Sequence, residues 1–202
     1  MANIVKPRKI IDRKALKSRL DELVSWSGYT PKTQGQVLDI FKDAHQTGWD
    51  EVRRRFEEGE ADGPETTRAM AYLVDQVVRT LYEFATVSVY PAANPTMGEQ
   101  MALMATGGYG RGEMAPYSDI DLMFLLPYKL TPHSEQVVEF ILYMLWDLRL
   151  KVGHATRSSD EALRLANDDL TIRTSLLEAR WLSGNQKLAK AFKKRFRNEL
   201  VD

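Results

Sequence analysis

Residues 104–124, with the sequence MATGGYGRGEMAPYSDIDLMF, decide the fold class of this 202-residue chain. An apolar run ends in Gly107 and Gly108, and a second apolar run begins beside Asp119 and Asp121. Short apolar runs that are bounded by glycine and turn residues are typical of buried strands. The stretch therefore predicts a strand, a glycine turn, a short helix and a second strand.

The second strand carries two carboxylates on one face. Because alternate side chains of an extended strand point the same way, Asp119 and Asp121 face one spot while Ile120 and Leu122 face the core. Two adjacent carboxylates without a cation repel each other, and one of them is pushed toward protonation. Mg²⁺ removes this conflict, because it binds one or two protein carboxylates together with water and substrate phosphates. The pair is therefore a candidate metal and catalytic site.

The glycine turn is a candidate phosphate site. Gly107 and Gly108 let a phosphate approach the backbone closely, and the N–H groups of the turn and of the helix after it face an anion. Arg111 is expected to add a charge-assisted contact to the nucleotide. Ser118 has two open roles, since its hydroxyl suits either a phosphate oxygen or a cap on the local backbone.

Each motif alone also has an ordinary structural explanation. A Gly-Gly pair is most often only a turn, and an Asp-x-Asp sequence is common at solvated strand ends. The combination of a glycine turn with a same-face acid pair at the entry to the next buried strand is much more specific. A P-loop is excluded because no Lys-Ser or Lys-Thr follows the glycines, and the glycine spacing of a dinucleotide-binding fold is absent.

Helices flank this stretch on both sides. Apolar residues at helical spacing predict two or three amphipathic helices over residues 12–58 and a long, heavily buried helix after Pro64. A buried helix over residues 132–150 and a third strand over residues 152–157 follow the acid pair, and only helices are predicted from residue 160 onward. The fold class is therefore α+β, a small mixed sheet flanked by helices and preceded by an N-terminal helical region.

The composition excludes several classes of partner. Lys plus Arg and Asp plus Glu each total 28, so no net charge attracts nucleic acid or an anionic membrane. The chain has no cysteine, and its N-terminus lacks the apolar core of a signal peptide. No uncharged apolar run reaches the length of about 20 residues that crosses a bilayer. We expect a cytoplasmic protein without disulfides.

The glycine turn and the acid pair together are similar to the signature of the DNA polymerase beta-type nucleotidyltransferase superfamily. The fuller strings GGYGRGE at residues 107–113 and PYSDIDL at residues 116–122 resemble more closely the bacterial uridylyltransferases of the PII nitrogen-signalling protein. Residues 145–154 and 176–184 also look like that family. The resemblance covers about residues 70–185.

This resemblance implies a polymerase beta-like fold and Mg²⁺-dependent transfer of UMP from UTP to a tyrosine of the PII protein. Asp119 and Asp121 would hold the metal ions, and the glycine turn would bind the triphosphate. Metal ions at such a site neutralise developing charge and activate the hydroxyl while pyrophosphate leaves in line. The family's enzymes also carry a hydrolase domain that removes UMP and glutamine-sensing domains. We therefore expect residues 1–65 to form a helical region and residues 66–202 to form a nucleotidyltransferase domain truncated from a longer enzyme.

One departure concerns the third carboxylate, which most members of the superfamily place on a later strand beside the first two. The candidate strand here has Gly153 and His154 and no acid. His154 is either a substitute ligand or phosphate contact, or a hydrogen-bonded structural residue. Glu178 is expected to form an ion pair with Arg180 or Arg173 rather than to bind a metal.

Two other functions stay open at this stage. An adenylyltransferase that modifies a protein such as glutamine synthetase shares the glycine turn and the acid pair, and these motifs bind phosphate and metal rather than a nucleobase. The second alternative is a catalytically inactive, nucleotide-binding regulatory module. The missing third acid favours this module, and the intact pair of Asp119 and Asp121 opposes it.

The last helical stretch, residues 186–200, has an apolar stripe that includes Leu188, Phe192 and Phe196 opposite a basic face. Either the nucleotidyltransferase core or a following domain would cover this stripe. In the second case we expect the chain to expose apolar surface and to self-associate.

Overall fold

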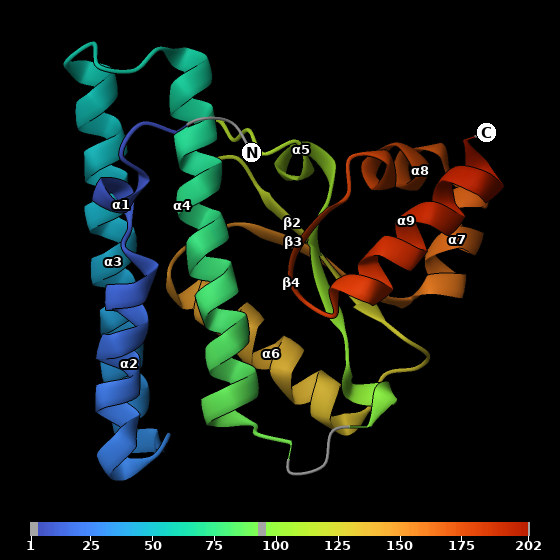
Figure 1. Cartoon of the computed structure of the whole chain (residues 1–202), viewed down its shortest axis with the longest axis horizontal. Coiled ribbons are helices and arrows are strands. Elements are labelled where there is room, and N and C mark those ends of the chain that lie inside the picture. The colour runs from blue at the N-terminus through green and yellow to red at the C-terminus, as the bar shows by residue number, and fades with distance from the viewer. Residues whose placement is uncertain (1–3, 93–95, 202) are drawn as a thin grey trace.

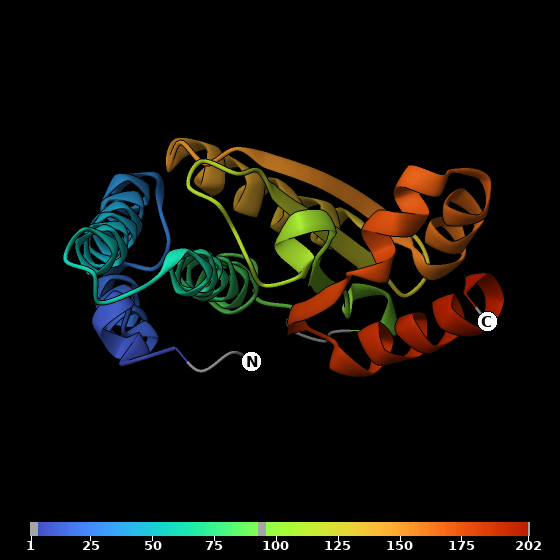
Figure 2. The same cartoon turned by 90° about the horizontal axis from the view of Figure 1, so that it is seen from above.

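The computed structural model describes residues 4–92 and 96–201 and has the expected α+β architecture. The elements in chain order are α1 (Pro7–Ile10), α2 (Arg13–Ser27), α3 (Pro31–Glu57), α4 (Gly63–Phe84), the π-helix η1 (Ala85–Val89), the 3₁₀-helix η2 (Met97–Glu99), β1 (Ala102–Ala105), α5 (Gly107–Gly110), β2 (Ile120–Leu126), α6 (Pro132–Asp147), β3 (Val152–Ser158), α7 (Ser159–Asp168), α8 (Leu170–Leu177), β4 (Arg180–Gly184) and α9 (Gln186–Leu200). Figures 1 and 2 show α2 and α3 outside α4 at one end of the molecule, and α7, α8 and α9 at the opposite end.

The strands form one mixed sheet in the order β3-β2-β1-β4. β2 and β3 run parallel, while β1 is antiparallel to both of its neighbours. Alternation along β2 sends Leu122 and Phe124 into a core shared with α4 and α6. Met123 and Leu125 enter a second core under α7, α8 and α9. Both faces of the sheet are covered, which explains why the strands are almost continuously apolar.

Side-chain caps define the starts of the two long N-terminal helices. Thr30 caps α3 and Asp62 caps α4, and in each case the residue three positions later bonds back to the backbone of the cap. Pro64 lies in the first turn of α4, as the sequence predicts. Among the described residues, no helix combines the length and the apolar character that crossing a membrane requires.

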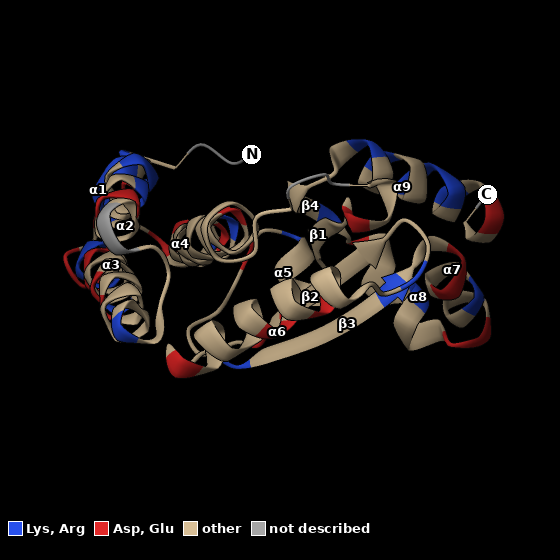
Figure 3. Ribbon diagram, turned by 90° about the horizontal axis from the view of Figure 1, so that it is seen from below, with Lys and Arg blue, Asp and Glu red and all other residues tan. Residues whose placement is uncertain are grey.

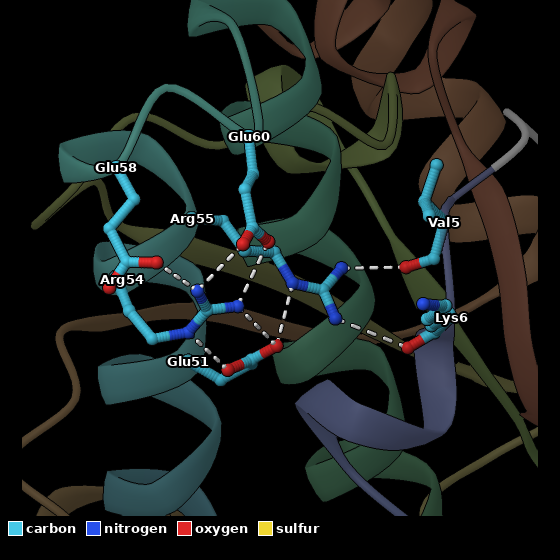
Figure 4. Close-up of polar contacts among 7 residues, drawn as sticks. All are labelled: Val5, Lys6, Glu51, Arg54, Arg55, Glu58 and Glu60. Carbon is cyan, nitrogen blue, oxygen red and sulfur yellow. Dashed lines mark hydrogen bonds and ion pairs between the residues drawn. The ribbon is translucent and has the colours of Figure 1, made fainter.

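An ion-pair cluster on α3 fastens the segment that precedes α1. Arg55 is buried, and its guanidinium donates hydrogen bonds to the carbonyl oxygens of Val5 at 2.6 Å and Lys6 at 3.3 Å. Hydrogen bonds from Arg54 and Arg55 lower the pKa of Glu51 to about 2, so this carboxylate stays charged. Figure 4 shows the whole cluster, which also includes Glu58 and Glu60.

The C-terminal half contains a strand where the sequence pattern predicts only helices. Residues 180–184 form the edge strand β4, which lies between α8 and α9 along the chain and pairs with β1. The register shifts between Leu103 and Met104, which marks an irregularity in this pairing. A strand this short depends on its neighbour in the sheet rather than on its own periodicity, so the pattern did not indicate it.

The apolar stripe of α9 is covered by the sheet of the same domain. Phe192 and Phe196 are buried in the core to which the sheet contributes Met104 and Met123. The Lys and Arg positions of α9 mark its remaining surface (Figure 3). Of the two alternatives for this stripe, the structure shows the first, in which its own domain covers it, so the condition for the expected self-association is not met.

Candidate active site

The acid pair lies at the start of β2. Asp121 is the second residue of the strand, on the face that carries Met123, and Asp119 immediately precedes the strand. Asp121 is half-buried, whereas Asp119 is exposed. Burial raises the pKa of Asp121 above its usual value of 3.8, and the charge of Asp119 raises it further. The two carboxylates are therefore close enough for their charges to interact.

The Asp121 carboxylate occupies space that two glycines leave free. A Cβ atom at Gly107 would lie 2.8 Å from Asp121 Oδ2, and a Cβ atom at Gly153 would lie 2.6 Å from Asp121 Oδ1. Real Cβ atoms essentially never make such short contacts. Gly153 is the direct partner of Asp121 in the parallel register of β2 and β3, so strand pairing holds it there. We call Gly107, Gly153 and Asp121 the Asp121 socket.

The glycine turn joins β1 to this socket. Gly107 has a left-handed backbone, with φ of 55°, and begins the single-turn helix α5. The amide of Thr106 donates to the carbonyl oxygen of Asp121 at 3.0 Å, which ties the turn to the acid strand. Thr106 is the N-cap of α5, yet within the described chain its side chain accepts no bond from the helix. The first amides of α5 therefore remain available to phosphate oxygens.

Arg111 and Ser118 differ in their surroundings. Arg111 forms an ion pair with Glu178, in which Nη1 lies 2.6 Å from Oε2. The expected partner of Glu178, Arg180 or Arg173, is therefore wrong, and Glu178 competes with a phosphate for the Arg111 guanidinium. Ser118 is exposed, and its hydroxyl makes no hydrogen bond to the residues that the structure describes, so nothing supports its capping alternative.

Within the described part of the chain, no third metal ligand joins the acid pair. Among the described residues, no group of three or more acidic, histidine or cysteine side chains could hold a metal ion. His154 pairs with Leu122 in the β2–β3 register, so its side chain lies on the face of the sheet opposite Asp121. There it contacts Trp146 of α6, with ring centroids 6.2 Å apart. His154 is therefore not a substitute ligand for a metal bound by Asp121.

Ser175 of α8 lies beside the glycine turn, although the sequence pattern did not single it out. Its hydroxyl oxygen is 3.6 Å from the point where a Cβ atom at Gly107 would stand. The same point is 2.8 Å from Asp121, so a serine hydroxyl and a carboxylate flank one backbone position. No local motif marks Ser175, because only the packing of α8 on α5 brings it there.

The donor set fits Mg²⁺ better than a metal that is enclosed by protein ligands. Asp119 and Asp121 supply hard carboxylate oxygens, and Mg²⁺ fills its other positions with water and substrate phosphates. Burial raises the pKa of Asp121, and the negative charge of Asp119 raises it further. A bound divalent ion would lower this pKa by supplying the missing positive charge.

Known proteins share both the domain and the surrounding helices. A family model described as a nucleotidyltransferase domain matches residues 97–182. The bifunctional uridylyltransferase/uridylyl-removing enzyme of Rhodospirillum rubrum is 51% identical over 193 residues, which make up 96% of this chain and 21% of that protein. The enzymes of the same description from Azospirillum brasilense and Novosphingobium aromaticivorans are 48% and 44% identical over 99% and 100% of the chain. The chain spans about one fifth of the length of these relatives.

Proposed function

The chain is a homologue of the bifunctional uridylyltransferase/uridylyl-removing enzymes and carries a nucleotidyltransferase domain, and from this premise we propose that it transfers UMP from UTP to a tyrosine of a PII signalling protein. The observation that carries the proposal is that the Asp121 carboxylate lies beside Gly107, where the uncapped amides of α5 begin. Amides that bind phosphate and a carboxylate that binds a divalent cation are the two components that nucleotidyl transfer requires.

In the proposed reaction the tyrosine oxygen attacks the α-phosphorus of UTP. A bond forms between that oxygen and phosphorus, the bond to the bridging oxygen of the β-phosphate breaks, pyrophosphate leaves and the phenolic proton passes to solvent. The amides of Gly107 and Gly108 bind triphosphate oxygens, and Ser175 is placed to donate a further hydrogen bond. Asp119 and Asp121 would hold Mg²⁺, which would supply positive charge to neutralise the phosphates. In this proposal Ser118 and Arg111 both contact the phosphates, and Glu178 competes with them for the Arg111 guanidinium.

We assign the transfer to residues 66–202 and propose that residues 1–65 form a supporting helical region. We place the protein and its proposed reaction in the cytoplasm.

The direct test incubates the purified chain with Mg²⁺, a PII protein and UTP labelled at the α-phosphate. We expect label on the PII protein with UTP and much less with ATP, and we expect none with Asp119→Asn or Asp121→Asn. Label from ATP on glutamine synthetase instead would favour the adenylyltransferase alternative. Binding of Mg-UTP without any transfer would favour the regulatory module, which the missing third acid also favours.

A further inference from the structure

A buried cluster of Asp75, Tyr109 and Arg180 joins three elements of the fold. Asp75 lies on α4, Tyr109 on α5 and Arg180 on β4, and the first two are only 7% and 1% exposed. The Tyr109 hydroxyl donates to Asp75 Oδ1 at 2.7 Å. Arg180 donates to both carboxylate oxygens, from Nη1 to Oδ2 at 2.5 Å and from Nη2 to Oδ1 at 3.0 Å. One carboxylate therefore accepts three hydrogen bonds from two elements of the nucleotidyltransferase domain.

Arg180 also caps the end of α5. Its Nε donates to the carbonyl oxygen of Gly110 at 3.2 Å, and its Nη2 donates to the carbonyl oxygen of Tyr109 at 3.2 Å. The last carbonyl groups of a helix lack intrahelical donors, and an arginine at this end satisfies them while its charge complements the helix terminus. The guanidinium that Asp75 orients is therefore the group that holds the far end of the glycine turn.

α5 is too short to set its own orientation, which depends on its contacts with the rest of the domain. It is a helix of four residues, and helices this short are unstable in isolation. The opposite side of Gly110 is also in contact, because a Cβ atom there would lie 2.3 Å from the carbonyl oxygen of Glu178. Burial and the neighbouring carboxylate of Asp75 raise the pKa of Tyr109 well above its usual value, so its hydroxyl keeps the proton that it donates.

We infer that Asp75 and Arg180 are positioning residues for the phosphate-binding turn. The identity of the ligand, Mg-UTP, rests on the proposed function. The orientation of α5 does not depend on it. Asp75 acts through Arg180 and Tyr109, and none of the three needs to touch the nucleotide.

The test replaces Arg180 by lysine, which keeps the charge but has three donors on a single nitrogen and cannot replace the four hydrogen bonds that Arg180 donates from three nitrogens. The matched control is Arg13→Lys, because Arg13 also binds an acid of α4, Glu83, and its side chain is 29% exposed against 28% for Arg180. Arg13 makes no contact with α5 among the hydrogen bonds and ion pairs of the described residues. Thermal unfolding first selects variants that remain folded.

Two measurements then separate positioning from general stability. Hydrogen exchange without nucleotide is expected to speed up at the Gly110 amide of α5, which donates to Thr106, in Arg180→Lys and to stay unchanged in Arg13→Lys. The KM for UTP is expected to rise about tenfold, the effect of losing one hydrogen bond to a charged group, while the KM for the acceptor protein stays constant. Asp75→Asn is expected to move the same two quantities in the same direction.

Wild-type exchange at α5 together with an unchanged KM for UTP in a folded Arg180→Lys protein would overturn the inference. If Arg180→Lys does not fold, Tyr109→Phe replaces it, since this change removes only the hydroxyl that binds Asp75. Unchanged α5 exchange in that folded variant would overturn the inference equally. If wild type itself binds no Mg-UTP, the proposed function fails, while the exchange comparison still decides whether Asp75 and Arg180 position α5.

Discussion

The substitution Gly153→Ala tests whether the Asp121 socket sets the position of the carboxylate. Gly153 does not have a positive φ, so alanine meets no backbone strain and only the new Cβ atom matters. Its distance to Asp121 Oδ1 would be 2.6 Å and has to grow to about 3.4 Å, so the carboxylate retreats by about 0.8 Å. A side-chain rotation achieves this at a cost of about 1 kcal/mol, the usual cost of leaving a rotamer minimum.

The same displacement has a much larger effect on transfer. A misplacement of about 1 Å in a reacting group costs about 100-fold in rate, so we expect kcat to fall by about that factor while the melting temperature changes little. The control is Gly35→Ala in α3, where a Cβ atom would meet nothing within 4 Å and should stabilise the helix by up to about 1 kcal/mol. Label transfer from UTP and thermal unfolding are measured on both variants. A folded Gly153→Ala protein with wild-type kcat would refute the reasoning.

Four further substitutions probe other parts of the site. Asp121→Asn is expected to abolish transfer and, in metal-free buffer, to be more stable than wild type. Because folding raises the pKa of Asp121, this gain in stability is absent at low pH and develops as the pH rises past 3.8. Added Mg²⁺ should stabilise only the wild-type protein. Gly107→Ala should lose stability, because Gly107 has a φ of 55° and a Cβ atom there would crowd Asp121, whereas Gly108→Ala should fold normally. Equal losses of unfolding free energy in the two variants, measured by chemical denaturation, would contradict this contrast. Glu178→Gln breaks a partly exposed ion pair and should change stability by less than about 1 kcal/mol. Because it also frees Arg111, it should lower the KM for UTP. An unchanged or higher KM would mean that Arg111 does not bind the triphosphate.

The long elements of the fold were predictable because each carries its own pattern. β2 is a seven-residue apolar strand directly after Asp119, and α4 shows a broad apolar face after a capping box at Asp62. β4 was not predictable, because its five residues include Arg180 and Ser183 and it owes its conformation to pairing with β1. Local periodicity identifies elements whose own sequence is strongly apolar. It misses an edge strand whose conformation depends on pairing with a neighbouring strand.

The site divides in the same way. Asp119, Asp121 and the glycine turn lie within one short stretch, so their proximity follows from strand geometry. The partner of Arg111 is 67 positions away, and the partners Asp75 and Arg180 are separated by 105 positions. No spacing rule reaches that far, so these contacts depend on how α4, α8 and β4 pack around α5. For His154 the sequence left two roles open, and the strand register decides against the ligand role, because a one-residue step along β3 puts its side chain on the face opposite Asp121.

The Asp121 socket also bears on conformational entropy. The carboxylate oxygens lie against the backbone of Gly107 on one side and of Gly153 on the other, which leaves the side chain few rotamers to visit. Fixing a free side chain normally opposes the binding of a ligand, because rotamer freedom is lost at that moment. At this site most of the loss occurs when β2 and β3 pair, before any cation arrives. A metal ion that binds here meets an acceptor whose direction is already set, and its affinity is not reduced by the ordering of Asp121.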